Sequence, residues 1–146
     1  MHLADVNIWL ALAFPEHALH SPVGDWLGER GADARLLFCR STQQSFLRLL
    51  TNANVSRSYD LPPLTNSQAW RLYERVLSDP RVQFVVEPKG TQTHWKLFTD
   101  RATASPKLWM DAYLAAFAVA GAYGFVTADR SFRQYSGLKA VILTPA

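Results

Sequence analysis

The sequence has few of the features that mark secreted and membrane proteins. Its 146 residues include one cysteine, Cys39, which excludes an internal disulfide framework and a cluster of thiolate metal ligands. No apolar run approaches the roughly 20 residues that a membrane-spanning helix needs. The opening segment MHLADVNIWL carries an acid where a signal peptide would carry positive charge, so no secretion signal is expected. We therefore expect a cytoplasmic protein without a membrane segment.

An extreme charge is missing as well. The formal net charge is +3 and the pI is about 9.2, and the basic residues are scattered rather than gathered in a tail. This balance is compatible with an anionic partner but does not require one. Hydrophobic residues, by contrast, make up 49% of the chain. That is enough to bury the core of one domain, expected to span residues 1–146.

Short apolar segments alternate with helical patterns along the chain. Strands are predicted at His2–Val6, Arg35–Cys39, Arg81–Val86, Phe125–Thr127 and Lys139–Leu143. Helices are predicted at Asn7–Phe14, His17–Gly28, Gln43–Leu50 with Ser41 or Thr42 as N-cap, from Thr65 or Asn66 to Asp79, Thr93–Ala102 and Lys107–Ala120. Residues 51–64 are predicted to form a polar loop. Because strands that alternate with helices form βαβ units, the predicted fold is α/β, with a central parallel sheet and helices on both faces.

Three aspartates lie at the edges of apolar segments: Asp5 in LADVNIWLALA, Asp111 in LWMDAYLAAFAVA and Asp129 in GFVTADRSF. Burying an unpaired charge is costly, so these positions suit packing poorly. In an open parallel sheet, ligands bind outside the carboxyl ends of the strands, which is where all three side chains are expected. Grouped carboxylates repel one another, and Mg²⁺ takes oxygen ligands. The pattern therefore predicts a Mg²⁺ site.

Each aspartate also has a purely structural interpretation. Asp5 could cap the helix that begins near Asn7, and Asp111 could complement a helix dipole. Asp129 could be a turn residue. Taken singly, each structural interpretation is favoured. Taken together, the three structural interpretations are less convincing, because all three side chains would have to lie by accident at the edge of the sheet where ligands bind.

The same segments resemble the PIN-domain ribonucleases, and among them the toxin components of VapBC-type toxin–antitoxin pairs. The similarity lies in DVNIWLALA, FCRSTQQSFLRLLT, WMDAYLAAFA and FVTADRSF, in the right order and at compatible spacing over essentially the whole chain. The opening D-x-N alone is a weak signal. Its combination with a D-A-Y-L-A-A helix and a V-T-x-D-x-x-F strand end is a strong one.

The resemblance implies a Mg²⁺- or Mn²⁺-dependent endoribonuclease with a cognate VapB-type antitoxin as partner and a homodimer as assembly. Carried over by motif, Asp5, Asp111 and Asp129 would form the acidic metal site. Asn7 and Thr127 would be supporting polar residues. A metal-activated water would hydrolyse the RNA phosphodiester bond and leave a 5′-phosphate and a 3′-hydroxyl. Cations beside the motifs are candidates for neutralising RNA phosphates: Arg40, Lys107, Arg130 and Arg133.

The sequence departs from the family pattern at one place. Most members carry an acid early in the helix that here begins TQQSFLRLL, but this chain has no acid between Asp33 and Asp60. Gln44, or with less support Gln43, is expected to occupy that place. An amide can lend an oxygen to a metal but contributes no charge.

Two other functions therefore stay open. The missing acid is compatible with a PIN-like domain that binds RNA or protein without cutting. A phosphotransfer or receiver-type domain is a further alternative, because an aspartate at a strand end can be phosphorylated. It is disfavoured because Asp5 opens a D-x-N rather than a D-x-D, and because Asp129 stands where a receiver would carry a lysine.

Overall fold

The computed structural model describes residues 1–146 and contains a five-stranded sheet in which every strand pair is parallel. Its strand order is β3-β2-β1-β4-β5. The strands are β1 (His2–Ala4), β2 (Leu36–Phe38), β3 (Val82–Phe84), β4 (Gly124–Thr127) and β5 (Ala140–Ile142). The strand order reverses between β1 and β4. In sheets of this kind, the crevice beyond the carboxyl ends of two such strands is where ligands bind.

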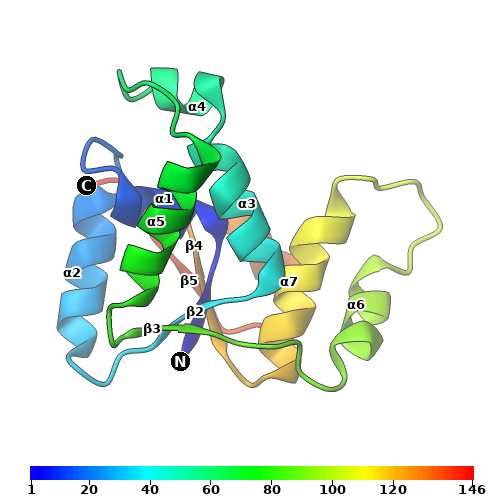
Figure 1. Cartoon of the computed structure of the whole chain (residues 1–146). Helices are drawn as coiled ribbons and strands as arrows, with labels where there is room; N and C mark the ends of the chain where they lie inside the picture. Colours follow the sequence, from blue (N-terminus) through cyan, green and yellow to red (C-terminus); the bar gives the residue numbers. More distant parts are fainter.

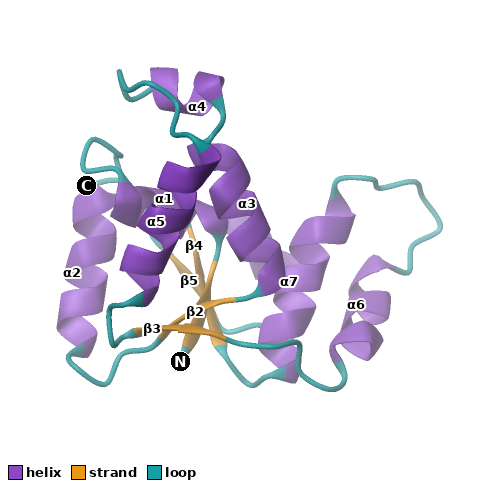
Figure 2. Ribbon diagram, viewed as in Figure 1, coloured by secondary structure: helices purple, strands orange, loops and turns teal.

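Helices cover both faces of the sheet, and Figure 2 shows the strands between the two groups. One group is α1 (Val6–Ala13), α2 (His20–Arg30), α3 (Arg40–Leu50) and α5 (Asn66–Leu77); the other is α6 (Thr91–Thr99) and α7 (Leu108–Ala120) (Figure 1). Two short elements, α4 (Ala53–Arg57) and the 3-10 helix η1 (Arg130–Gln134), complete the chain. The predicted α/β fold, with a parallel sheet and helices on both faces, is confirmed.

Alternating strand residues supply two hydrophobic cores. Ala4 and Phe38 face α1, α3 and α5, and the Trp9 indole stacks on the Phe38 ring with centroids 3.5 Å apart. Leu3 and Phe125 face the opposite way, against α7 and η1. Because neighbouring residues of a strand point to opposite faces, the three central strands β1, β2 and β4 are buried on both sides. The sheet is therefore a rigid support for the side chains that follow its strands.

All five predicted strands exist; four are shorter than predicted, and β4 begins one residue earlier than predicted, at Gly124. The first strand stops at Ala4 rather than Val6, because Asp5 already caps α1 by accepting a hydrogen bond from the Val6 backbone N–H. The helix predicted at Gln43–Leu50 begins earlier, at Arg40. Its N-cap is Cys39, so the prediction of Ser41 or Thr42 in that role is wrong. The hydroxyl of Thr42 instead accepts a hydrogen bond from the Cys39 backbone N–H at 3.0 Å.

Two short helices are absent from the sequence prediction. The polar loop predicted at residues 51–64 contains α4, whose N-cap Asn52 accepts hydrogen bonds from the backbone N–H groups of Asn54 and Val55. The other is η1, which Asp129 caps. The second helix also begins later than predicted, at His20 rather than His17.

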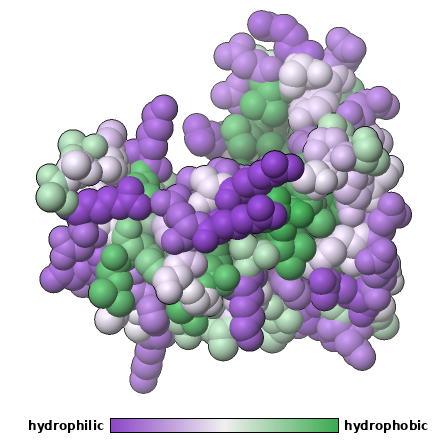
Figure 3. All heavy atoms as spheres, turned by 180° about the vertical axis from the view of Figure 1, so that it is seen from behind, coloured by the Kyte–Doolittle hydropathy of each residue, from purple (hydrophilic) through white to green (hydrophobic).

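The surface is mixed in character. Seen from behind, hydrophobic side chains form separate patches between hydrophilic ones (Figure 3). None of the helices combines the length and hydrophobicity that crossing a bilayer requires.

Candidate active site

Asp5 lies at the end of β1, where it is the N-cap of α1. Its Oδ1 accepts a hydrogen bond from the Val6 backbone N–H at 2.7 Å. Its Oδ2 accepts one from the Thr127 hydroxyl at 2.7 Å and one from the Asn7 side-chain amide at 3.2 Å. The residue is only 8% exposed. The helix-capping interpretation of Asp5 is correct, and the same hydrogen bonds hold its carboxylate in one orientation.

The Thr127 side chain joins the ends of β4 and β1. The residue is fully buried, and its hydroxyl accepts hydrogen bonds from the Asp129 backbone N–H at 3.0 Å and the Asn7 amide at 3.3 Å. Asn7 in turn accepts a hydrogen bond from the Ala128 backbone N–H at 3.3 Å. The two residues expected to support the site therefore connect both sides of the crevice between β1 and β4.

Asp129 follows β4 on the other side of that crevice. Its Oδ1 accepts a hydrogen bond from the Ser131 backbone N–H at 2.8 Å and so caps η1. The side chain is exposed, and its second oxygen makes no hydrogen bond within the protein. Asp129 thus has a structural role and a free carboxylate oxygen at the same time.

Asp111 reaches the same edge of the sheet from the opposite face. It lies in the first turn of α7, where a negative charge is favourable to the helix dipole. The side chain is half-buried and lines a cavity of about 440 Å³ together with Arg101, Lys107 and Tyr135. Its carboxylate makes no hydrogen bond within the protein, so it is free to bind a cation or water.

The three carboxylates influence one another's charge. Burial raises the pKa of Asp5, the nearby Asp129 adds to this effect, and the hydrogen bonds from Thr127, Val6 and Asn7 oppose it. Burial also raises the pKa of Asp111, with further increases from the charges of Asp5 and Asp129. A carboxylate charge that raises the pKa of another carboxyl group lies near it in space. The structure therefore brings the three predicted acids to one edge of the sheet.

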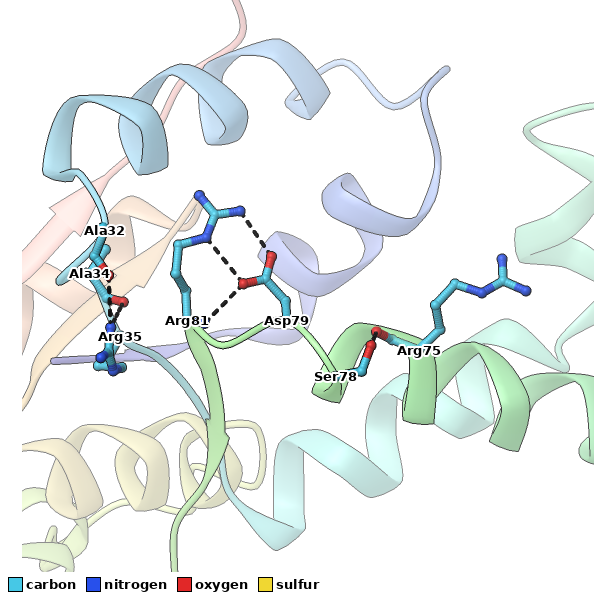
Figure 4. Close-up of polar contacts among 7 residues, drawn as sticks. All are labelled: Ala32, Ala34, Arg35, Arg75, Ser78, Asp79 and Arg81. Atoms are coloured by element: carbon cyan, nitrogen blue, oxygen red, sulfur yellow. Dashed lines mark hydrogen bonds and ion pairs between the residues drawn. The ribbon is translucent and has the colours of Figure 1, made fainter.

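No basic side chain forms an ion pair with any of the three aspartates. The single ion pair of the protein joins Arg81 to Asp79, with Nη2 and Oδ2 2.9 Å apart, in the turn between α5 and β3 (Figure 4). There, hydrogen bonds from the Arg81 guanidinium lower the pKa of Asp79. The pKa values of Asp5 and Asp111 move the opposite way. A cation bound among the three aspartates would offset the repulsion between their charges.

The spacing of the carboxylates limits how an ion could be held. No three carboxylate, imidazole or thiolate groups lie close enough together to ligate one ion directly. An ion bound by one or two of these carboxylates would complete its coordination shell with water. Mg²⁺ is commonly held in this way, because it dehydrates reluctantly. The buried Asp5 and the half-buried Asp111 fit such a role, with Asp129 acting directly or through water.

Gln44, the residue expected in the place of the missing acid, is exposed. It lies on the exposed side of α3, between Arg40 and Arg48 at a spacing of four residues. Its amide makes no hydrogen bond within the protein. Gln43 is buried, 6% exposed, and accepts a hydrogen bond from the Arg40 guanidinium. Neither amide is hydrogen-bonded to any of the three aspartates.

Helix geometry favours another residue of α3 for that position. The flank of α3 that carries Leu47 faces α5, because Leu47 lines a small cavity with Trp70. At 3.6 residues per turn, Ser45 lies on the opposite flank, where it is half-buried. The helix α1, which Asp5 caps, also packs on α3. The role expected of Gln44 stays a prediction, and Ser45 is the half-buried position next to it on the same helix.

The four predicted RNA-binding cations are all exposed but are not equivalent. Arg40 is turned toward β3, with its guanidinium 4.7 Å from the centroid of the Phe84 ring. Lys107 precedes α7 directly and lines the cavity that contains Asp111. The remaining two, Arg130 and Arg133, lie in η1 and form no ion pair. Of the four, Lys107 is thus placed by the structure at the carboxylates.

Two further residues of this cavity are absent from the sequence prediction. Arg101 donates a hydrogen bond from Nη2 to the Gln134 side chain at 3.1 Å. The Tyr135 hydroxyl is buried without a hydrogen-bond partner, and burial, followed by the charge of Asp111, raises its pKa to about 12. Arg101 could have been proposed from the sequence, because it is a cation in the loop that precedes the helix of Asp111. Nothing in the sequence singled out Tyr135.

Comparison with known proteins identifies the fold family. The model of the PIN domain matches residues 3–138. The chain belongs to the PIN-domain family. The matched range contains the three aspartates together with Asn7 and Thr127. The phosphotransfer or receiver-type alternative is therefore wrong.

Relatives within the family are similar over nearly the whole chain. Ribonuclease VapC41 of Mycobacterium tuberculosis is 47% identical over 144 residues, which cover 98% of this chain and 99% of the relative. Ribonuclease VapC31 of the same organism is 30% identical over 141 residues, or 95% of this chain and 96% of the relative. The resemblance to PIN-domain VapC proteins inferred from the sequence motifs is confirmed.

Solved structures share the fold at low sequence identity. VapBC2 from Rickettsia felis, bound to a DNA fragment from its promoter, matches with a TM-score of 0.69 and 13% identity, over 98% of this chain and 98% of that one. Mycobacterium tuberculosis VapC20, described as a toxin that cleaves the sarcin–ricin loop, matches with a TM-score of 0.60 and 14% identity. It covers 95% of this chain and 98% of that one. At such identities these matches establish the fold alone.

Proposed function

We propose that this PIN-domain protein is an endoribonuclease that hydrolyses RNA phosphodiester bonds with the help of Mg²⁺ or Mn²⁺. The observation that carries the proposal is the cluster of Asp5, Asp111 and Asp129 at the crevice between β1 and β4, none of which forms an ion pair. Support for RNA as the substrate comes from the relative that is 47% identical, which is called a ribonuclease.

Asp5 and Asp111 would hold the metal ion, and Asp129 would reach it directly or through water. When bound, the ion would polarise a phosphate oxygen and lower the pKa of a water molecule, so that a nucleophile forms at neutral pH. Thr127 keeps the Asp5 carboxylate in position through its 2.7 Å hydrogen bond. Such supporting hydrogen bonds orient metal ligands and tune their basicity.

Two other groups would act on the RNA or on the attacking water. The exposed oxygen of Asp129 is free to accept a hydrogen bond from that water, because its other oxygen is occupied by the Ser131 backbone N–H. Lys107, at the rim of the Asp111 cavity, would neutralise a phosphate of the bound strand. Both roles use side chains that the protein leaves unpaired.

The proposed biological role is that of a toxin held in check by a VapB-type antitoxin. Two of the similar solved structures are VapBC complexes, from Rickettsia felis and Salmonella typhimurium, and they support such a partner for this chain. We further propose that the protein acts in the cytoplasm and forms a homodimer. Size-exclusion chromatography with light scattering, on the purified chain with and without the antitoxin, would test both assemblies.

The test of the proposed activity is cleavage of a structured RNA by the purified protein. We expect cleavage with Mg²⁺ or Mn²⁺ and none in EDTA. Asp111→Asn should abolish cleavage without unfolding the protein, because it removes a charge from a side chain that makes no hydrogen bond within the protein. Its circular dichroism spectrum is the control for folding. Cleavage that persists in Asp111→Asn, after contaminating nuclease is ruled out, would contradict the proposed role of Asp111.

A second function is favoured by one observation, the absence of any acid between Asp33 and Asp60. With one carboxylate fewer than most of the family, the domain could bind RNA or protein without cutting it. That function predicts RNA binding that is unaffected by Mn²⁺, together with no cleavage at any metal concentration. The metal titration of RNA cleavage therefore separates the two candidates.

A further inference from the structure

A groove leads from Asp111 along the loop that connects α6 to α7. It consists of two adjoining cavities, of about 440 and 830 Å³, that share the lining residues Arg101, Ser105, Pro106 and Leu108. The smaller cavity reaches Asp111, and the larger one reaches Trp95 and Trp109. The connecting loop extends outward between the two helices in Figure 1. The groove is thus continuous with the candidate active site.

Basic residues follow this groove. Arg101 lines both cavities, and its hydrogen bond to Gln134 of η1 places the guanidinium between them. Lys107 lines the cavity next to Asp111, and Lys96 lines the outer one. Asp100 is the one acid of the groove outside the proposed metal site. The positive charge therefore exceeds the negative charge along the path away from the carboxylates.

An aromatic side chain lies at the far end of the groove. Trp109 is 51% exposed, which is unusual for so large an apolar ring. The Trp95 indole N–H donates a hydrogen bond to the Trp109 backbone carbonyl at 2.9 Å, and the two rings meet at 77° with centroids 5.9 Å apart. Trp109 is therefore held in place while much of its ring stays open to solvent.

The inner end of the groove contains a polar group that has no partner. Tyr135 is 5% exposed, it lines the same cavity as Asp111 and Lys107, and its hydroxyl makes no hydrogen bond within the protein. Buried hydroxyls are rarely left unpaired. Because this hydroxyl is itself closed to solvent, the groups of the cavity that can meet a ligand are Arg101 and Lys107, and they favour an anion.

We propose that this groove binds a single-stranded segment of the RNA, next to the phosphate that is cleaved. Arg101 and Lys107 contact backbone phosphates, and an unpaired base stacks on Trp109. The positive charge and the continuity with Asp111 favour RNA over a polypeptide as the occupant. A base can reach Trp109 only when it is not paired in a duplex, so the groove selects loops and single strands. This inference rests on the proposed ribonuclease function.

The test is binding of a short 5′-fluorescein oligouridylate to the full-length protein in EDTA, measured by fluorescence anisotropy. Trp109→Ala should weaken binding about tenfold or more, the usual effect of losing a base–aromatic stack. Trp109→Phe should retain most of the affinity, because it keeps an aromatic face. Arg101→Gln should reduce the slope of log affinity against log salt by about 0.7, as expected when one phosphate of a single strand is no longer neutralised.

Two variants outside the groove are matched controls. Trp70→Ala removes an indole of similar exposure, 47%, and Arg71→Gln removes an exposed guanidinium, both on α5. Neither should change the affinity for the oligouridylate. Binding of an RNA duplex should respond equally to Trp109→Ala and Trp70→Ala. Circular dichroism verifies that each variant is folded.

Several outcomes would overturn the proposal. Equal affinities of Trp109→Ala and Trp70→Ala for the oligouridylate would do so, as would a wild-type protein that does not bind it. Weaker capture of a co-expressed antitoxin by Trp109→Ala, with RNA binding unchanged, would assign the groove to a protein partner instead. Metal-dependent cleavage by the wild type is measured in parallel. If one of these results is found while the wild type still cleaves RNA, the groove assignment alone has failed. If the wild type does not cleave RNA, the ribonuclease function itself has failed.

Discussion

The hydroxyl of Thr127 donates a 2.7 Å hydrogen bond to Oδ2 of Asp5 and so joins β4 to β1 at the point where the strand order reverses. The same oxygen accepts hydrogen bonds from the Asp129 backbone N–H and the Asn7 amide. A hydroxyl has one hydrogen to donate and two lone pairs. Every hydrogen-bonding position of the Thr127 hydroxyl is therefore used, and the orientation of the buried carboxylate depends on it.

Thr127→Val tests this relationship, because it removes the hydroxyl and keeps the shape of the side chain. Loss of a group that orients a metal ligand typically lowers activity by about 10- to 100-fold. The free energy of unfolding should also fall by about 1–3 kcal/mol, because the Asp129 N–H loses its partner and Asp5 loses its shortest side-chain hydrogen bond. Single-turnover RNA cleavage with Mn²⁺ and urea unfolding in EDTA measure the two effects. Thr127→Ser, which keeps the hydroxyl, should retain most of both properties.

A divalent ion should stabilise the folded protein. A ligand that binds only the native state at a hundredfold excess over Kd adds about 2.7 kcal/mol to the free energy of unfolding. We therefore expect millimolar Mn²⁺ to raise the melting temperature of the wild type, and to raise it far less in Asp5→Asn. Differential scanning fluorimetry with Mn²⁺ and with EDTA measures the shift. The same increase in both proteins would mean that the ion binds away from Asp5.

Without metal, the charge of the carboxylate cluster should weaken the fold as the pH rises. The pKa values of Asp5 and Asp111 are raised in the native state, mainly by burial. At a pH between the pKa of these carboxyl groups in the unfolded chain and their higher pKa in the native protein, the native protein therefore holds more protons than the unfolded chain. In that window the free energy of unfolding falls as the pH rises. The stabilisation is complete at low pH and is lost as the pH passes the native pKa.

Asp111→Asn isolates this effect, because an amide carries no charge at any pH. In EDTA at neutral pH, the variant should melt at a higher temperature than the wild type. This difference in melting temperature should shrink as the pH is lowered to about 4, the usual pKa of an aspartate, because the wild-type carboxylates then take up protons. Melting curves of both proteins over this pH range are the measurement. A variant that melts below the wild type at neutral pH would show that Asp111 makes a stabilising contact in the metal-free protein.

Local features of the sequence were sufficient to predict the α/β fold and the edge where the acids lie. The side-chain periods of strands and helices differ, which separates the two kinds of element in the sequence. Asp5 directly follows β1 and Asp129 comes two residues after β4, and these parallel strands end at the same edge of the sheet. The exact start of α3 could not be predicted this way. Cys39 is an uncommon N-cap, and Thr42 supports it from the third helical position. Residue preferences alone favour Ser41 or Thr42.

The groove depends on contacts between distant parts of the chain, which no local pattern reveals. Arg101 and Gln134 are 33 residues apart, and their side chains meet only because η1 and the loop after α6 lie at the same edge of the sheet. The unpaired hydroxyl of Tyr135 is likewise a property of tertiary packing. Identifying these residues requires the positions of three separate segments, whereas Asp111 could be found from one.

The helix α3 carries no acid. Ser45 lies on the half-buried flank of α3 opposite α5, and Gln44 lies on the exposed face beside Arg48. Ser45→Glu should therefore add a carboxylate near the metal site, and Gln44→Glu should add one in solvent. A nearby opposite charge shifts the pKa of a carboxylate by about 1–3 units. By the same interaction, Ser45→Glu should tighten Mn²⁺ binding by about tenfold or more.

Isothermal titration calorimetry of the wild type and both variants with Mn²⁺ measures this difference, and RNA cleavage against Mn²⁺ concentration gives a second readout. Ser45→Glu should also lower the melting temperature in EDTA, because a fourth carboxylate adds repulsion that only a cation relieves. Gln44→Glu serves as the matched control, since it adds the same charge one residue away. If Gln44→Glu tightened Mn²⁺ binding and Ser45→Glu did not, Gln44 would be the position of the missing acid, as the sequence predicts, and the assignment to Ser45 would be wrong.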